Sequence, residues 1–230
     1  MDFADPGLET RVRLAARGLG GAGLVHAYGH CSARIDARSF LVCAAMPMGL
    51  IRDEPGTIVP IEGELPPGVL GEVRAHQAIY RARPDVGGIC RIMPPAIMSL
   101  STMGITPAAR HGLGAYFAPA PPLWNDPRLL RDTVAASGLA EALGSAPAIV
   151  MRANGAITVG RNIEEAAAFA FFLEDAARVE RDIRSMGLDP ATGLLDESEI
   201  RARQTLSGGV VERLWQWLTE APAQTGGHPT

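Results

Sequence analysis

Two short apolar runs joined by a turn, with a long amphipathic helix directly after them, constrain the fold more than any other feature. The runs at residues 148–151 and 156–159 have the length of buried strands, and Asn154-Gly155 between them is typical of a tight turn. The segment 163–184 has helical spacing, with Ala and Phe on its apolar face. Such a unit predicts an α/β domain in which a helix packs on a sheet.

The rest of the chain alternates in the same way, without a repeat or a low-complexity tract. Further helices are predicted at residues 8–19, 71–83, 94–103, 128–143 and 198–220. Further strands are predicted at Ile35 and at residues 39–43, 57–61 and 86–92. The Pro- and Gly-rich stretch 107–126 is expected to be irregular, and residues 223–230 are expected to form a frayed tail.

Length and charge limit the classes of protein that the chain can belong to. It has 230 residues, 47% of them hydrophobic and 20% charged, which suffices for one domain with a substantial core. With 21 basic and 25 acidic side chains the net charge is −4, so the chain has no basic field to attract phosphates. We expect no nucleic-acid partner.

The ends and the cysteines indicate a compartment. Residues 1–25 carry acids and arginines where a signal peptide needs an apolar run, and no later stretch reaches the length of a membrane span. Cys31, Cys43 and Cys90 lie far apart in the sequence, which favours buried thiols over disulfides. We therefore expect a cytoplasmic protein with no membrane partner.

Lysine is absent from the sequence, so all 21 basic side chains are arginines. This absence excludes Schiff-base catalysis, an internal aldimine with pyridoxal phosphate and the phosphate-binding lysine of a P-loop. Catalysis by this chain cannot depend on a lysine.

Several motifs occur in a fixed order. A glycine-containing turn followed by Ser and Arg reads Gly29-His30-Cys31-Ser32-Ala33-Arg34, and a helix with an acid, a histidine and an Arg-Pro-Asp stop carries Glu72, His76, Tyr80 and Arg83-Pro84-Asp85. The strand Arg91-Ile92-Met93 and the turn Asn154-Gly155 before the long helix follow. In this order the motifs resemble the class II aldolase/adducin family, from about residue 8 to residue 184. His30 stands where sugar-phosphate aldolases usually carry Asn, which is similar to the decarboxylase-like branch.

The resemblance implies a three-layer α/β/α domain with a mainly antiparallel central sheet. It also implies a homo-oligomer, which we expect to be a tetramer with clefts at the subunit boundaries. The class II aldolase-like domain would span residues 1–190, and residues 191–230 would form a C-terminal helical extension and tail.

The metal-binding positions of the family are altered in this sequence. In the family, two histidines spaced i, i+2 on a strand and a third from the later turn hold a divalent metal that polarises the substrate carbonyl. The matching residues here are Arg91, Met93 and Asn154. A guanidinium cannot become a ligand, and a thioether and an amide oxygen hold Zn or Mn weakly. We predict that the metal site is lost and that the chain uses no cofactor.

Glu72 and Arg91 are the candidate catalytic residues. The resemblance gives Glu72 a role in proton transfer, whereas Glu72 and His76 alone would equally fit an exposed helical pair. Arg91 follows the apolar run 86–90 and has three interpretations. It forms a surface ion pair, it neutralises Glu72, or it binds a substrate carboxylate or enolate.

The candidates for substrate binding are His30, Ser32, His76, Asn154 and Gly155. His30 would donate to a substrate oxygen or bond to the backbone. Asn154 is also explained by the turn alone, because Asn tolerates a positive φ.

Four further side chains are left open by the sequence. His111 and Tyr116 would reach the cleft or lie elsewhere, and Trp215 and Trp217 would anchor a subunit contact or cap the core.

Two functions follow. The first is a metal-independent carbon-carbon lyase, acting by retro-aldol cleavage or decarboxylation on a small anionic oxo- or hydroxy-acid. In it, Arg91 takes the place of the metal and Glu72 moves the proton. The second is a non-catalytic class II aldolase-like protein that binds or scaffolds. Arginine rather than alanine at position 91 favours the first.

Overall fold

A seven-stranded sheet forms the centre of the molecule. The computed structural model describes residues 6–220. The strands are β1 (His30–Arg34), β2 (Ser39–Val42), β3 (Thr57–Pro60), β4 (Gly88–Ile92), β5 (Leu123–Trp124), β6 (Ala148–Met151) and β7 (Ala156–Gly160). Their order is β3-β2-β1-β4-β7-β6-β5, and every neighbouring pair is antiparallel except β5 with β6. The prediction of a mainly antiparallel sheet is confirmed.

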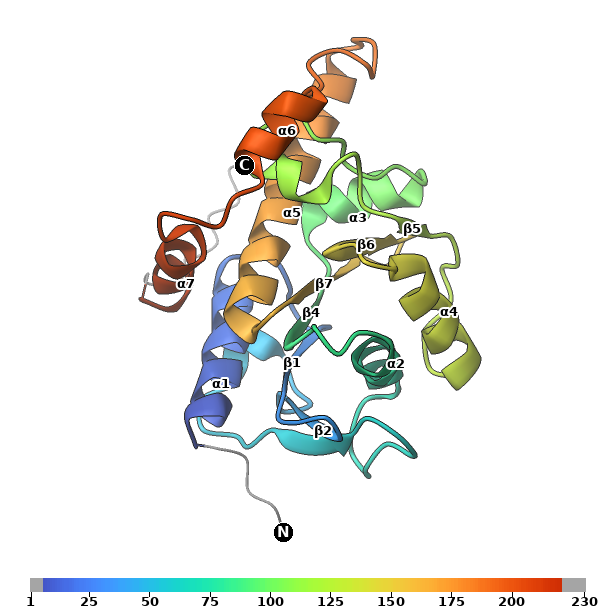
Figure 1. The fold of residues 1–230 in the computed structure, drawn as a ribbon. Coiled ribbons are helices and arrows are strands. Elements are labelled where there is room, and N and C mark those ends of the chain that lie inside the picture. Colours follow the sequence, from blue (N-terminus) through green and yellow to red (C-terminus); the bar gives the residue numbers. More distant parts are fainter. Residues whose placement is uncertain (1–5, 221–230) are drawn as a thin grey trace.

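Helices cover both faces of this sheet. They are α1 (Pro6–Gly21), α2 (Arg74–Ala82), α3 (Pro95–Thr102), α4 (Thr133–Leu143), α5 (Ile163–Ser185), α6 (Glu197–Arg203) and α7 (Val210–Glu220). Three short 3-10 turns, η1 (Met48–Leu50), η2 (Gly71–Val73) and η3 (Gly114–Phe117), lie between them. Helices α1, α3, α5 and α7 contribute to one buried apolar cluster, and α2 and α4 contribute to the other. Figure 1 shows α1 and α5 on one side of the strands and α2 and α4 on the other, which confirms the α/β/α layers.

Strand β4 shows how the sequence separates the two clusters. Its residues Cys90 and Ile92 belong to the cluster of α1 and α5, whereas Ile89 belongs to the cluster of α2 and α4. Because successive side chains of a strand point to opposite faces, Arg91 lies on the same face as Ile89. A charged side chain thus enters the layer between the sheet and α2.

Strand β1 begins earlier than predicted. The sequence placed the strand signal at Ile35, but the strand is His30–Arg34 and Ile35 belongs to the turn that leads to β2. Its residues Cys31 and Ala33 are apolar and buried, as expected for alternate residues of a strand that face the core. His30 and Ser32 are also buried, because side chains of α2 satisfy their hydrogen bonds. Because His30 and Ser32 are polar although buried, the sequence does not show the apolar run expected of a buried strand.

Three other boundaries differ from the prediction. Helix α4 starts at Thr133 rather than 128, because the Asp132 carboxylate accepts a hydrogen bond from the Ala135 N–H at 2.8 Å and caps the helix there. The predicted helix 198–220 is two helices, α6 and α7, separated by Gly208 and Gly209, which both have positive φ. Strand β5 lies in the stretch that was expected to be irregular, and with two residues it is too short to show a period.

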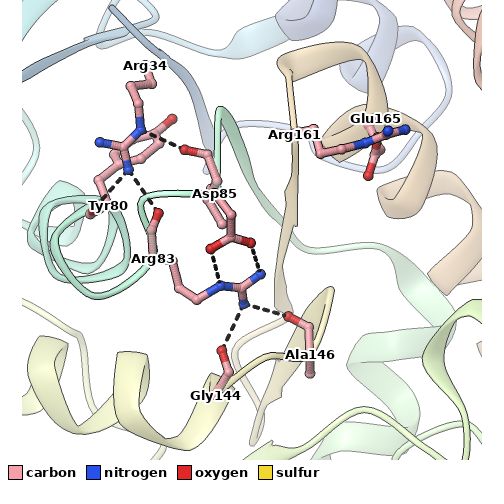
Figure 2. Close-up of polar contacts among 9 residues, drawn as sticks. Arg34, Tyr80, Arg83, Asp85, Gly144, Ala146, Arg161 and Glu165 are labelled. Carbon is pink, nitrogen blue, oxygen red and sulfur yellow. Dashed lines mark hydrogen bonds and ion pairs between the residues drawn. The ribbon is translucent and has the colours of Figure 1, made fainter. Parts of the chain in front are cut away.

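Two arginines hold α2 against its neighbours (Figure 2). Arg34 of β1 donates to the carbonyls of Tyr80 at 2.8 Å and Arg83 at 3.0 Å, and its guanidinium carbon lies 4.7 Å from the centre of the Tyr80 ring. These are carbonyls at the end of α2, which the helix itself leaves unsatisfied. Arg83 pairs with Asp85 at 2.7 Å and donates to the carbonyl of Gly144, just after α4, at 2.8 Å. The C-terminal ends of both helices are thereby fixed.

Helix α3 is capped by a side chain from another helix. It begins at Pro94 and Pro95, with no side-chain cap from its own N-terminal residue. The buried Glu174 carboxylate of α5 accepts from the backbone N–H groups of Ala96 at 3.0 Å and Ile97 at 3.1 Å. A carboxylate at a helix N-terminus satisfies free N–H groups and complements the helix dipole. Helix α5 therefore positions the segment that directly follows β4.

The C-terminal helix α7 packs against the cluster of α1 and α5. Leu218 is buried there, and Trp215 packs against the same cluster. Trp217 is 39% exposed and meets Phe171 edge to face. Within the chain the tryptophans therefore cap the core, while a subunit contact at Trp217 stays a prediction. So does the division at residue 190, and the predicted tail 223–230 falls outside the described residues.

Candidate functional site

His30 and Arg91 lie directly opposite each other on neighbouring strands. Strands β1 and β4 are antiparallel, and His30 pairs with Arg91 in their register. Side chains at opposed positions lie on the same face of a sheet, so both enter the layer beside α2. The preceding Gly29 permits this pairing, because a Cβ there would lie 2.9 Å from the Arg91 carbonyl oxygen.

Arg91 is buried and all its hydrogen-bond partners are neutral. Only 7% of the residue is exposed. Its Nη2 donates to Asn154 Oδ1 at 2.6 Å and to the Asn154 carbonyl at 3.2 Å, and its Nη1 donates to the Tyr28 carbonyl at 3.3 Å. Within residues 6–220 Arg91 forms no ion pair, so the interpretation as a surface ion pair is wrong.

Asn154 is explained by Arg91 rather than by the turn. The loop between β6 and β7 is closed by a hydrogen bond from the Met151 N–H to the Gly155 carbonyl at 2.8 Å. Positive φ angles occur at Ala153, 55°, and Gly155, 77°, and not at Asn154. The expectation that Asn154 serves the turn through a positive φ is therefore wrong. Gly155 itself is required, because a Cβ there would lie 2.0 Å from the Ile92 carbonyl oxygen.

Burial perturbs the Arg91 cation. It lowers the pKa of Arg91 to about 10, and the negative charge of Glu72 acts in the opposite direction. The side chain is still charged at neutral pH, so the layer holds a positive charge whose direct hydrogen-bond partners, within the described residues, are neutral. Such a charge attracts an anion strongly, because little water screens it.

A chain of hydrogen bonds runs from His30 into the core. His30 Nδ1 lies 2.9 Å from His76 Nε2, and His76 Nδ1 lies 2.6 Å from Ser32 Oγ. Ser32 Oγ lies 2.9 Å from the Tyr80 hydroxyl. Ser32 and His76 have no exposed surface, and Tyr80 is 1% exposed. Burial therefore keeps a ligand from direct contact with Ser32, His76 or Tyr80.

The two histidines of this hydrogen-bonded chain, His30 and His76, are held neutral by their surroundings. Burial is the main cause of the lowered pKa of His76, about 3, and the Arg91 charge adds to it. The pKa of His30 is also lowered well below its ordinary value, by burial and by the neighbouring His76 and Arg91. At neutral pH each ring carries one proton.

Glu72 lies outside this hydrogen-bonded chain. It sits in the short turn η2 before α2, and its carboxylate accepts from Arg131 Nε at 2.9 Å. His76, one turn later, is fully buried. Glu72 and His76, which were predicted to face one cleft, therefore lie in different surroundings: Glu72 forms a partly exposed ion pair and His76 lies in the core. Glu72 acts on Arg91 through its charge and not through a direct ion pair. The interpretation of Arg91 as the direct partner of Glu72 is therefore wrong.

A recess lies beside His30. It is a shallow depression open to solvent, and His30, Cys43, Leu70 and Val73 are among its lining residues. Its walls come from β1, from the end of β2 and from the segment around η2. His30 is thus the member of the hydrogen-bonded chain that borders this depression.

His111 and Tyr116 belong to another part of the fold. The Tyr116 ring stacks on Phe172 of α5, and its hydroxyl donates to the Thr205 carbonyl. The His111 ring lies near Gly114. Burial is the main cause of the lowered pKa of His111, and the Arg203 charge lowers it further. Both residues face α5 and α6 rather than α2.

Sequence reasoning missed three groups of this site. Tyr80 follows His76 by one helical turn, and this spacing predicts that the two side chains lie on the same face of the helix. The Tyr28 carbonyl and the Arg131 side chain gave no such signal, because loops bring them to Arg91 and Glu72.

Two further features bear on binding. Across residues 6–220, no three side chains of His, Cys, Asp or Glu are grouped so as to hold a metal ion. None of the helices in the same range is both long enough and apolar enough to cross a bilayer.

Comparison with known proteins agrees with this architecture. Residues 11–180 match the family described as Class II Aldolase and Adducin N-terminal domain. The chain belongs to this family. The L-fuculose 1-phosphate aldolase from Glaciozyma antarctica PI12 superposes with a TM-score of 0.80 at 23% sequence identity, over 96% of this chain and 93% of that one. This likeness shows the fold.

Two curated relatives carry the name 3,4-dihydroxyphthalate decarboxylase. The protein from Terrabacter sp. (strain DBF63) is 27% identical over 194 residues, which cover 75% of this chain and 77% of the relative. The protein from Arthrobacter keyseri is 27% identical over 203 residues, covering 79% and 80%. Proteins similar to this chain thus carry the names of aldolases and of decarboxylases.

Proposed function

We propose that this chain is a metal-independent carbon-carbon lyase that acts on a small anionic oxo- or hydroxy-acid. The observation that carries the proposal is the buried Arg91 guanidinium, whose partners are the neutral groups Asn154 and Tyr28. A buried cation without a counter-ion is costly in a resting protein but binds a carboxylate or enolate well. The decarboxylase names of the curated relatives support the decarboxylation form of this reaction.

The residues at the positions that would hold a metal in the family do not fit a divalent ion. By resemblance these positions are Arg91, Met93 and Asn154. The Arg91 charge repels a second cation, and the Asn154 amide oxygen, which is a neutral oxygen donor, already accepts from Arg91 at 2.6 Å. We infer that Arg91 takes the place of the metal.

The proposed chemistry assigns one task to each group. When a carbon-carbon bond of the substrate breaks, its electron pair stays on one of the two fragments and is delocalised onto an oxygen as an enolate. The Arg91 N–H groups stabilise this oxygen, and one such donor supplies about 3 kcal/mol of transition-state stabilisation. His30, opposite Arg91, is the second donor. In decarboxylation, carbon dioxide leaves and Glu72 passes a proton taken from solvent to the carbon that kept the electron pair. In retro-aldol cleavage, Glu72 takes the proton of the hydroxyl group that becomes a carbonyl, and the other carbon gains a proton. Both require the Glu72 carboxyl to leave Arg131.

Direct assay tests this proposal. Metal-free protein is incubated with 3,4-dihydroxyphthalate and with a panel of oxo- and hydroxy-acids, and products are identified by mass spectrometry. We expect turnover that a chelator does not reduce, that Arg91→Met abolishes, and that Arg128→Gln, a change at an exposed side chain, leaves intact. Turnover that appears only after a divalent metal is added would refute the proposal.

A second candidate is supported by Glu72. Its carboxylate is engaged by Arg131, as in a structural ion pair. This favours a non-catalytic member of the family that keeps the Arg91 layer for binding or scaffolding. Such a protein would bind small acids through Arg91 and turn none of them over.

Homo-oligomerisation, as a tetramer with clefts at the subunit boundaries, also stays a proposal. It would complete the open side of the recess beside His30.

A further inference from the structure

We infer that Ser32 and His76 are positioning residues that hold His30 as a neutral donor, with its only ring proton on Nε2. The ligand atom that meets His30 must then be an acceptor, such as a carboxylate or enolate oxygen. This inference rests on the proposed function, because it concerns recognition at the same site. It follows from counting the hydrogens of the buried chain between Tyr80 and His30.

The buried Tyr80 hydroxyl determines which group donates in each hydrogen bond between Tyr80 and His30. The buried Tyr80 hydroxyl has Ser32 Oγ, 2.9 Å away, as its partner within the described residues. If Ser32 donated to Tyr80, the hydrogen of Tyr80 would be buried without an acceptor. An unsatisfied buried donor costs about 1–3 kcal/mol. Tyr80 therefore donates to Ser32.

Each following hydrogen bond then has one consistent direction. The Ser32 hydroxyl, which accepts from Tyr80, donates its own hydrogen to His76 Nδ1 at 2.6 Å. His76 is neutral, so its single proton is on Nε2, and this N–H donates to His30 Nδ1 at 2.9 Å. His30 is neutral as well, so its proton is on Nε2.

The position of His30 allows its Nε2 proton to be donated to a ligand. Nδ1 is turned toward His76, so Nε2 is the ring nitrogen left for a ligand. His30 lines the recess and is paired with Arg91 across the sheet. A cation and a neutral N–H donor side by side suit an anionic oxygen, and neither can act as a base at neutral pH.

Nitrogen-15 NMR of histidine-labelled protein tests the inference directly. Protonated and unprotonated ring nitrogens have well separated shifts, and a His30→Gln variant assigns the His30 signals. We expect both His30 and His76 to carry their proton on Nε2 between pH 6 and 8. A proton on Nδ1 of either ring, or a doubly protonated His30 at pH 6, would overturn the inference.

Ser32→Ala tests the positioning role, because Ser32 is fully buried behind His30 and His76. We expect the His76 and His30 rings to become mixtures of tautomers and the affinity for phthalate or pyruvate to fall about tenfold, the effect of one weakened hydrogen bond to a charged group. Ser101→Ala, at another fully buried serine, should change neither. An unchanged affinity in Ser32→Ala, despite mixed tautomers, would overturn the positioning role. If wild-type protein binds neither acid while the predicted tautomers are observed, the proposed function fails and the assignment of the His30 proton stands.

Discussion

Replacing Arg91 with methionine should remove anion binding at little cost in stability. Methionine fills a similar volume without charge, so the change isolates the guanidinium. The pKa of Arg91 falls from its ordinary 12.5 to about 10 on burial. At 1.36 kcal/mol for each pKa unit, holding this charge in the fold costs about 3 kcal/mol.

The hydrogen bonds that the variant loses have a similar magnitude. The bond to Asn154 Oδ1, at 2.6 Å, is short and charge-assisted, and such bonds contribute about 1.5–3 kcal/mol. The bonds to the carbonyls of Asn154 and Tyr28 are longer, at 3.2 and 3.3 Å, and contribute less. Because Glu72 keeps Arg131, no buried carboxylate is left unpaired. The free energy of unfolding should therefore change by no more than about 1.5 kcal/mol.

Urea unfolding at pH 7.5, with and without small carboxylic acids, measures both effects. Wild-type protein should gain about 2.7 kcal/mol when an acid is present at one hundred times its Kd, and Arg91→Met should gain nothing. Arg91→Lys should recover part of the gain, because it restores the charge without the planar fork. A loss of 3–5 kcal/mol in Arg91→Met, together with no gain in wild type, would show that Arg91 is structural and refute the reasoning.

Three further predictions follow from the described residues. Because the folded-state pKa values of His30 and His76 lie below those of the unfolded chain, unfolding takes up protons below pH 6.5. Lowering the pH from 7.5 to 5.5 should thus cost about 1.4 kcal/mol for His76, and His30 should add to this loss; His76→Gln should remove the His76 share in urea titrations. Glu174→Ala should lower the free energy of unfolding by about 3 kcal/mol through the lost cap of α3, and Glu174→Gln by about half as much, whereas the exposed Glu141→Ala should change it little. Light scattering should give the mass of a tetramer at micromolar concentration, and a monomer would remove the proposed subunit boundary from the recess.

The sequence predicted the fold where periodicity and end signals were strong. The unit β6-turn-β7-α5 was predicted nearly to the residue, because its apolar runs are buried on both faces and Asn162 caps the helix. Strand β1 was misplaced because His30 and Ser32 occupy buried positions that only a tertiary network makes tolerable.

The sequence named candidate residues for the site but not the contacts between them. The sequence brought Arg91 and Asn154 to one place through the family resemblance, and the structure joins them by a hydrogen bond. It could not show that Glu72 pairs with Arg131, since a distance of 59 positions in the chain separates them. It also could not show that His76 turns inward, because either face of a short helix was open to that ring.

The cap that α5 provides for α3 has a consequence for the order in which the molecule forms. Helix α3 has eight residues, starts with proline and has no cap from its own N-terminal residue, so it is too short to persist alone. Its first N–H groups find their acceptor in Glu174, 78 positions away from Ala96. Helix α3 can therefore form only after most of the chain has been synthesised and α5 has docked on the sheet. The amide protons of Ala96 and Ile97 should consequently exchange with solvent only when α5 detaches, which makes them reporters of that opening.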